Sequence, residues 1–228
     1  MKRPDGVFCM RQDQIIEGVL QNKVIAIVRG ANQDNIVHIA EALYAGGIRF
    51  LEVTFPYKKP EKYGETTEMI RMLVSHFEQK LHVGAGTVMT PECTELAANA
   101  GASYIISPNT DARVIRKTKE LGLVSIPGAY TPTEIAEAIA QGADFVKLFP
   151  AAAAGSAYIK AVLAPLRGVK LIATGGISLD NCAEFLQCGC VGLGVGGKLA
   201  DLNMIAQKRY EELTKAAELM LKKLKEAG

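Results

Sequence analysis

A single lysine interrupts an otherwise apolar stretch, Asp144-Phe145-Val146-Lys147-Leu148-Phe149-Pro150. Such a stretch is typical of a strand that is buried on both faces, as in a parallel sheet covered by helices. Burial of an ammonium group favours its neutral form, and a neutral amine is the nucleophile that forms a Schiff base. A lysine whose stem packs while its amine reaches water would produce the same pattern. The stretch by itself leaves both interpretations open.

A glutamate lies in a second apolar stretch, residues Ile48 to Phe55. Strand alternation puts two sets of side chains each on one face: Phe50, Glu52 and Thr54, and Phe145, Lys147 and Phe149. If both faces point into the same interior, Glu52 and Lys147 converge there. The pair could then be a structural ion pair, or a proton shuttle beside an amine nucleophile.

Other residues near the ends of apolar stretches are suited to binding an anionic substrate. Arg29 and Thr87 offer a guanidinium and a hydroxyl group, which can hold a carboxylate. Gly175-Gly176 and Gly196-Gly197 follow the last two apolar stretches, where glycine lets backbone N–H groups approach a phosphate, although such doublets also form tight turns. Four further strand-end residues complete the expected pocket: Thr54, Pro108, Phe149 and Thr174.

The elements that must position these residues alternate regularly along the chain. Strands are predicted over Val24–Val28, Ile48–Phe55, Leu81–Val88, Ser103–Pro108, Val124–Ala129, Asp144–Pro150, Val169–Thr174 and Val191–Val195. Helices are predicted over Met10–Asn22, Asp34–Ala45, Glu65–Phe77, Pro91–Ala100, Asp111–Leu121, Thr133–Gln141, Ser156–Leu166, Leu179–Gln187 and Met204–Lys225.

Eight strands that are each followed by a helix predict an α/β fold of the (β/α)8 TIM-barrel type. This prediction includes an N-terminal helix before the first strand, a long C-terminal helix, and a single domain over residues 1–228. An open doubly wound sheet is the alternative, but no G-x-G-x-x-G motif follows Val28. In a barrel the active site forms at the carboxyl ends of the strands, where the candidate residues lie.

The composition of the 228-residue chain is that of an ordinary globular protein, with 49% apolar and 22% charged residues and a net charge of +2. We expect no nucleic-acid surface, no membrane span and no signal peptide, because basic clusters and long apolar runs are missing from the sequence. Five cysteines (Cys9, Cys93, Cys182, Cys188 and Cys190) have no metal-site spacing and suggest free thiols in a reducing cytoplasm.

Several short motifs in order resemble the 2-keto-3-deoxy-6-phosphogluconate (KDPG) and 4-hydroxy-2-oxoglutarate aldolase family. The likeness covers about residues 20 to 200. The motifs are Leu51-Glu52-Val53-Thr54, Val83-Gly84-Ala85-Gly86-Thr87-Val88, Ile106-Ser107-Pro108, Ile126-Pro127-Gly128, Val146-Lys147-Leu148-Phe149-Pro150-Ala151, Ala173-Thr174-Gly175-Gly176-Ile177 and Gly194-Val195-Gly196-Gly197.

The resemblance implies a class I aldolase, a homotrimer of barrels in the cytoplasm that needs no metal or other cofactor. Such an enzyme cleaves a 2-keto-3-deoxy-6-phospho sugar acid to pyruvate and glyceraldehyde 3-phosphate. Lys147 matches the Schiff-base lysine, Glu52 the general acid and base, and Thr87 a contact to the pyruvate carboxylate. The glycines after the seventh and eighth strands match the phosphate site.

Two positions depart from the family pattern. Many members carry an arginine just after the glutamate strand, where this chain has Pro56, and Arg29 of the first strand is expected to replace it. Lys198 stands where some members have a phosphate-binding serine, so it could bind phosphate or indicate a different substrate. The alternative enzyme is a related 2-keto acid aldolase or decarboxylase that acts on an unphosphorylated substrate such as 4-hydroxy-2-oxoglutarate. A non-catalytic trimeric scaffold is the alternative outside enzymes. Loss of Glu52, Lys147 or Thr87 would mark it, and all three are present.

Overall fold

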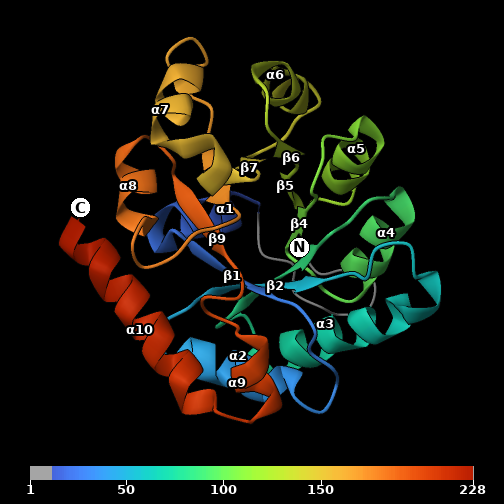
Figure 1. The fold of residues 1–228 in the computed structure, drawn as a ribbon. Helices are drawn as coiled ribbons and strands as arrows, with labels where there is room; N and C mark the ends of the chain where they lie inside the picture. The colour runs from blue at the N-terminus through green and yellow to red at the C-terminus, as the bar shows by residue number, and fades with distance from the viewer. Residues whose placement is uncertain (1–11, 228) are drawn as a thin grey trace.

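A ring of parallel strands surrounded by helices makes up the fold in the computed structural model, which describes residues 12–227 (Figure 1). The strands of this part of the chain are β1 (Val24–Val28), β2 (Phe50–Thr54), β3 (His82–Gly86), β4 (Tyr104–Ile106), β5 (Val124–Ile126), β6 (Gly128–Ala129), β7 (Val146–Leu148), β8 (Leu171–Thr174) and β9 (Gly192–Val195). Their order in the sheet is β5-β4-β3-β2-β1-β9-β8-β7-β6, and every pair is parallel.

The barrel closes through Pro127, which separates β5 from β6. Proline has no N–H group to donate, so the predicted strand Val124–Ala129 is recorded as two short strands. Its first half pairs with β4 and its second half with β7, and the Lys147 N–H donates to the Pro127 carbonyl at 2.8 Å. The nine strands are therefore eight barrel positions, and the predicted (β/α)8 barrel is confirmed.

The helices alternate with the strands as predicted. They are α1 (Gln12–Asn22), α2 (Ile36–Ala45), α3 (Tyr63–Phe77), α4 (Pro91–Asn99), α5 (Ala112–Glu120), α6 (Pro132–Ala140), α7 (Ala151–Leu163), α8 (Cys182–Gln187), α9 (Leu202–Ala206) and α10 (Tyr210–Ala227). Polar residues define several of their first turns: Thr131, for example, forms a capping box with Glu134 at α6.

Two helices differ most from the sequence prediction, and α8 begins three residues later than predicted, at Cys182. The expected helix Met204–Lys225 is instead α9 and α10, because the chain turns between them at Lys208, which adopts a left-handed φ of 56°. Asp201 starts α9 two residues earlier than predicted by accepting hydrogen bonds from the Asn203 and Met204 N–H groups. Helix α7 begins at Ala151 rather than Ser156, with a non-helical Gly155 inside it.

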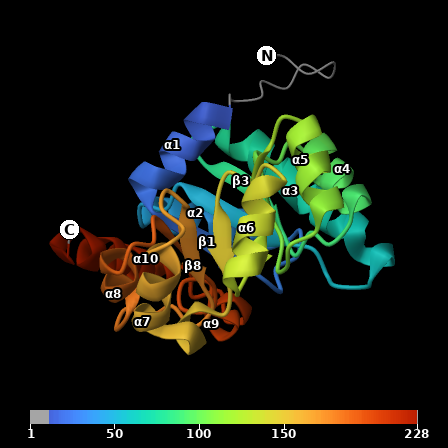
Figure 2. The same ribbon diagram turned by 90° about the horizontal axis from the view of Figure 1, so that it is seen from above.

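Helix α1 covers the amino-terminal end of the barrel, opposite α9 (Figure 2). Its Ile15 and Val19 belong to the same buried cluster as interior barrel residues such as Phe50 and Phe145. The expected beginning of this helix at Met10 lies outside the described residues. A larger cluster fills the layer between the strands and the outer helices. The amino-terminal end is thus filled by hydrocarbon, which leaves the carboxyl ends of the strands for a polar site.

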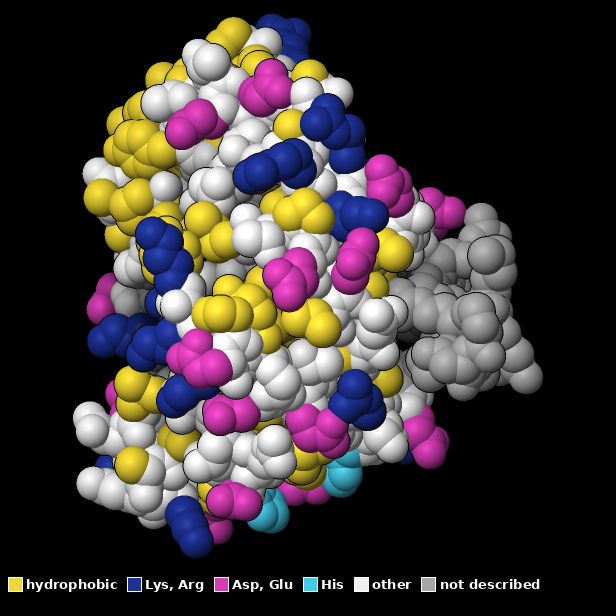
Figure 3. Space-filling view, turned by 90° about the vertical axis from the view of Figure 1, so that its right-hand side faces the viewer, with side chains coloured by type: hydrophobic (Ala, Val, Ile, Leu, Met, Phe, Trp, Pro, Cys, Tyr) yellow, Lys and Arg dark blue, Asp and Glu magenta, His cyan; other side chains and the backbone are white. Residues whose placement is uncertain are grey.

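The outer face formed by the helices on the right of Figure 1 carries mixed charges. Figure 3 shows lysine and arginine side chains interspersed with aspartate and glutamate there, not gathered in one basic patch. This face therefore lacks the electrostatic footprint of a nucleic-acid-binding surface. Cys93, Cys182, Cys188 and Cys190 are buried free thiols within residues 12–227, and Cys9 lies outside that range.

Candidate active site

Glu52 and Lys147 both point into the barrel interior, one layer above its aromatic filling. Phe50 of β2 and Phe145 just before β7 belong to the interior cluster, and alternation places Glu52 and Lys147 on the same faces, nearer the carboxyl ends. Glu52 is 0% exposed and Lys147 is 3% exposed. The converging arrangement predicted from the sequence is therefore present.

The electrostatics of this pair are dominated by burial. Burial raises the pKa of Glu52, and the charges of Lys147 and Arg29 oppose this shift. Burial also lowers the pKa of Lys147, which the Glu52 charge opposes and the Arg29 charge reinforces. Neither carboxylate oxygen of Glu52 has a hydrogen-bond partner in the described chain. The site thus favours a neutral amine beside a carboxyl group that can exchange a proton.

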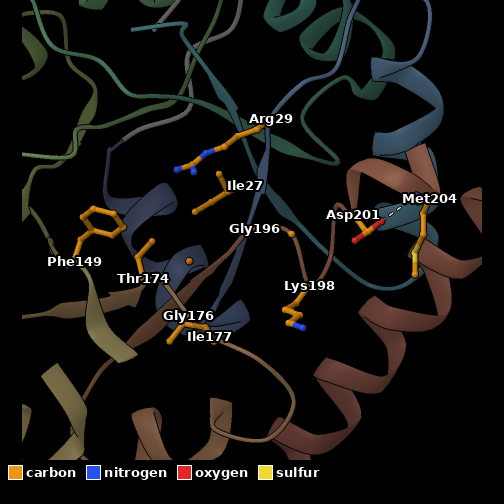
Figure 4. Close-up of a pocket in the computed structure, with 13 residues that line it drawn as sticks. Ile27, Arg29, Phe149, Thr174, Gly176, Ile177, Gly196, Lys198, Asp201 and Met204 are labelled. Atoms are coloured by element: carbon orange, nitrogen blue, oxygen red, sulfur yellow. Dashed lines mark hydrogen bonds between the residues drawn. The ribbon is translucent and has the colours of Figure 1, made fainter. Parts of the chain in front are cut away.

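A cavity of about 600 Å³ opens at the carboxyl ends of β1, β8 and β9 (Figure 4). The Phe149 ring forms part of its wall, and its centroid lies 5.1 Å from the Lys147 Nζ. Figure 4 shows Arg29 and Lys198 well apart around the cavity. The cavity therefore extends from a cation near the buried pair to a second cation near the surface.

The cavity brings together eight of the residues predicted from the sequence. These are Arg29, Phe149, Thr174, Gly175, Gly176, Gly196, Gly197 and Lys198. The other five are not part of its lining: Glu52, Lys147, Thr54, Thr87 and Pro108. The first two lie deeper, in the barrel interior. Of the two residues expected to bind the substrate carboxylate, Arg29 and Thr87, only Arg29 therefore lines the cavity.

The remaining predicted residues hold the rim of the barrel. Thr54 donates a hydrogen bond to the Val28 carbonyl at 3.3 Å, which links the ends of β2 and β1. Thr87 adopts a left-handed φ of 55°, an unusual conformation for a β-branched residue. Hydrogen bonds on either side of Thr87 maintain this conformation. The Phe55 N–H donates to the Gly86 carbonyl, and the Val88 N–H donates to the Ile106 carbonyl. Pro108 is half-buried after β4.

Sequence reasoning missed five residues of the cavity: Ile27, Ile177, Gly194, Asp201 and Met204. Alternation could have found two of them, since Ile27 lies two residues before Arg29 and Gly194 two before Gly196. Asp201 and Met204 reach the cavity from the start of the short helix α9. The sequence predicted a single long helix in place of α9 and α10. The Met204 N–H donates to Asp201 at 3.0 Å.

Two other expectations concern metals and membranes. Residues 12–227 contain no group of three or more His, Cys, Asp or Glu side chains placed to hold a metal ion. Within the same residues, every helix is too short or too polar to cross a bilayer.

A buried lysine near a buried carboxyl group, toward the carboxyl ends of the strands of a (β/α)8 barrel, is an arrangement suited to the class of barrel enzymes that form a Schiff base. The family model "KDPG and KHG aldolase" matches residues 15–216, and the chain belongs to this family. The predicted family is confirmed, and the enzyme is a class I aldolase, a carbon–carbon lyase.

Three relatives illustrate the similarity. The 2-dehydro-3-deoxy-phosphogluconate aldolase of Treponema pallidum is 36% identical over 77% of this chain and 83% of its own. The 2-dehydro-3-deoxy-6-phosphogalactonate aldolase of Escherichia coli is 35% identical with the same coverage. The crystal structure of KDPG aldolase from Legionella pneumophila, with pyruvate captured as a covalent carbinolamine, is 28% identical. It superposes with a TM-score of 0.81 over 90% of this chain and 97% of the other.

Proposed function

We propose that this aldolase cleaves a 2-keto-3-deoxy-6-phospho sugar acid of the KDPG type to pyruvate and glyceraldehyde 3-phosphate. The observation that carries the proposal is the buried pair of Lys147 and Glu52 beside a cavity with cations at separate positions. A substrate with a carboxylate at one end and a phosphate at the other matches that distribution of charge.

The reaction begins with attack of the neutral Lys147 Nζ on the C2 ketone. The carbinolamine takes up a proton and loses water to give an iminium ion, which accepts the electron pair of the C3–C4 bond as that bond breaks. Glu52, directly or through water, takes the proton of the C4 hydroxyl group, and the aldehyde leaves. Protonation of the enamine at C3 gives the pyruvate imine. Water then hydrolyses this imine, which releases pyruvate and the amine.

The two ends of the substrate have separate candidate contacts. Arg29 would hold the carboxylate by charge-assisted hydrogen bonds, with Thr87 contributing from the end of β3. Gly175-Gly176 and Gly196-Gly197 would approach the phosphate with backbone N–H groups, and Lys198 would add a positive charge. Thr54, Pro108, Phe149 and Thr174 would complete the pocket.

An unphosphorylated 2-keto acid such as 4-hydroxy-2-oxoglutarate is the second candidate. It is favoured by one observation, that the half-buried Asp201 lines the same cavity as the exposed Lys198. A carboxylate there opposes a dianionic phosphate. Pyruvate release from a panel of C6-phosphorylated and unphosphorylated 2-keto-3-deoxy acids, with both C4 epimers, distinguishes the two candidates.

The enzyme would act as a single barrel domain of residues 1–228, assemble as a homotrimer and work in the cytoplasm without a cofactor. Sedimentation analysis of the purified protein tests the assembly. Activity that persists after treatment with a chelator supports metal-independent chemistry, as the amine mechanism requires.

The core of the proposal is tested by trapping the imine. Incubation with pyruvate and borohydride, followed by digestion and mass measurement of the peptides, should show one adduct, on Lys147. Lys170 provides a matched control, because its Nζ also lies over an aromatic ring, 5.6 Å from the Phe145 centroid. Lys170→Met should leave trapping intact and Lys147→Met should abolish it. An adduct on any other lysine would remove the proposal.

A further inference from the structure

The side chain of Glu52 occupies the space that a side chain at position 86 would fill. A Cβ atom built on Gly86 would lie 1.6 Å from the Glu52 Oε1, 2.2 Å from its Cδ and 2.6 Å from its Cγ. Contacts under 3.0 Å cannot persist, so one of the two groups would have to move. The backbone of Gly86 does not lie in the left-handed region. Glycine is required here for the space it leaves and not for its conformation.

The register of the strands shows that the carboxylate leans toward the mouth of the barrel. Glu52 is paired with Gly84, and Gly86 is paired with Thr54, one alternation nearer the carboxyl end. The space over Gly84 is already filled, because a Cβ there would lie 2.1 Å from the Tyr104 ring. The Tyr104 side chain, 0% exposed, thus fills the space on the amino-terminal side of the Glu52 carboxylate. The open position is the notch over Gly86.

We propose that Gly86 is a positioning residue for the proton-transfer step, because its missing side chain forms the notch that holds the Glu52 carboxylate. The proposal rests on the role proposed above for Glu52. Steric fit matters here because no described protein group forms a hydrogen bond to either oxygen of this carboxylate. Steric contact therefore holds the Glu52 carboxylate in place where no hydrogen bond does. In this position the charges of Lys147 and Arg29 both act on the carboxylate.

The kinetic test compares Gly86→Ala with Glu52→Gln and with the double variant. Each single variant should lower kcat for pyruvate release by about 10²-fold or more, the range for loss of a general acid or base. Both should still form the borohydride-trapped adduct on Lys147. Because the two residues act through one carboxylate, the double variant should be hardly slower than Glu52→Gln. Gly64→Ala, a site with no heavy atom within 4 Å of the new Cβ, is the control and should keep full activity.

A stability measurement covers the case in which Gly86→Ala folds poorly. In the Glu52→Ala background the Glu52 Cγ, Cδ and Oε1 are gone, so the added methyl group fits the notch. Unfolding by urea should then show that Gly86→Ala is tolerated in Glu52→Ala and costly in the wild type. This coupling is expected only if the two side-chain spaces overlap.

The outcomes separate this inference from the proposed function. If Gly86→Ala keeps wild-type kcat, or if its loss multiplies that of Glu52→Gln, Gly86 does not act through Glu52 and the inference is overturned. Equal destabilisation by Gly86→Ala in both backgrounds overturns it as well. If Glu52→Gln itself keeps full activity, the proposed role of Glu52 fails first, and the positioning role of Gly86 fails with it.

Discussion

Two lysine–carboxylate pairs involve neighbouring residues of one segment, Asp144 just before β7 and Lys147 within it, and differ in almost every respect. Asp144, just before β7, receives the Lys119 Nζ at 2.7 Å on each oxygen and a hydrogen bond from the Ser125 N–H at 2.8 Å. Lys119 also donates to Gln12 of α1 at 3.3 Å. Lys147, three residues later, shares the interior with a Glu52 whose oxygens have no hydrogen-bond partner within the described residues.

The difference matches a structural role for the first pair and the catalytic role proposed for the second. The pair at the amino-terminal end is partly exposed, with side-chain exposures of 28% for Lys119 and 13% for Asp144. It fixes α1 and α5 to the barrel with conventional hydrogen bonds. The pair in the barrel interior is buried, and the Glu52 carboxylate has no hydrogen-bond partner within the described residues, which is costly to stability if the group stays charged. Perturbed, unpartnered groups beside a cavity are the physical signature of a functional site.

The largest effect that this comparison predicts is that of Lys147→Met. Without the amine no imine forms, so pyruvate release should fall by about 10⁴-fold or more, as for the loss of other covalent nucleophiles. The barrel should still fold, because methionine fills a similar volume and Glu52 can remain protonated. Steady-state assays and circular dichroism measure the two properties. Substantial activity in the folded variant would contradict the distinction between the pairs.

The periodicity of the sequence was enough to predict the barrel, because each βα unit satisfies its own local rules of alternation, capping and turn residues. The departures come from single residues whose effect is tertiary. Pro127 divides one strand because it lacks an N–H group, although the strand still pairs on both sides. Lys208 breaks the last helix by adopting a left-handed conformation, which is unusual for a non-glycine residue.

The chemical groups of the candidate site could be predicted from the sequence, but not which residues line its cavity. Strand alternation placed Glu52 and Lys147 on converging faces, because alternation has a fixed period. It could not show that Thr87 stays out of the cavity lining or that Asp201 enters it, since both depend on how loops pack. The notch over Gly86 was also hidden, because the Gly-Ala-Gly-Thr motif does not reveal which neighbour fills the missing side chain.

Lys119→Met tests the structural side of the comparison. It leaves the Asp144 carboxylate without its cation, and the free energy of unfolding should fall by about 1–3 kcal/mol, the range for a hydrogen-bonded, partly exposed ion pair. Activity of the folded variant should be unchanged. Urea unfolding and kcat measure both. Lys117→Met, on the same helix as Lys119, removes ion pairs with the more exposed carboxylates of Glu95 and Glu120. It is the control and should cost less. A loss of activity at unchanged stability would break the comparison.

The finest test is the pH dependence of imine formation, because only the neutral amine of Lys147 attacks a ketone. Burial lowers the pKa of Lys147, so the rate of imine formation should rise with pH along an acid limb. The midpoint of this limb should lie below the 10.5 of an ordinary lysine. The Glu52 charge raises this pKa and the Arg29 charge lowers it. Glu52→Gln should therefore shift the limb to lower pH, and Arg29→Met should shift it, by less, to higher pH. Trapping with acetone and cyanoborohydride follows the limb without a substrate carboxylate. Shifts of the same sign would show that the two charges do not act on Lys147 as the geometry requires.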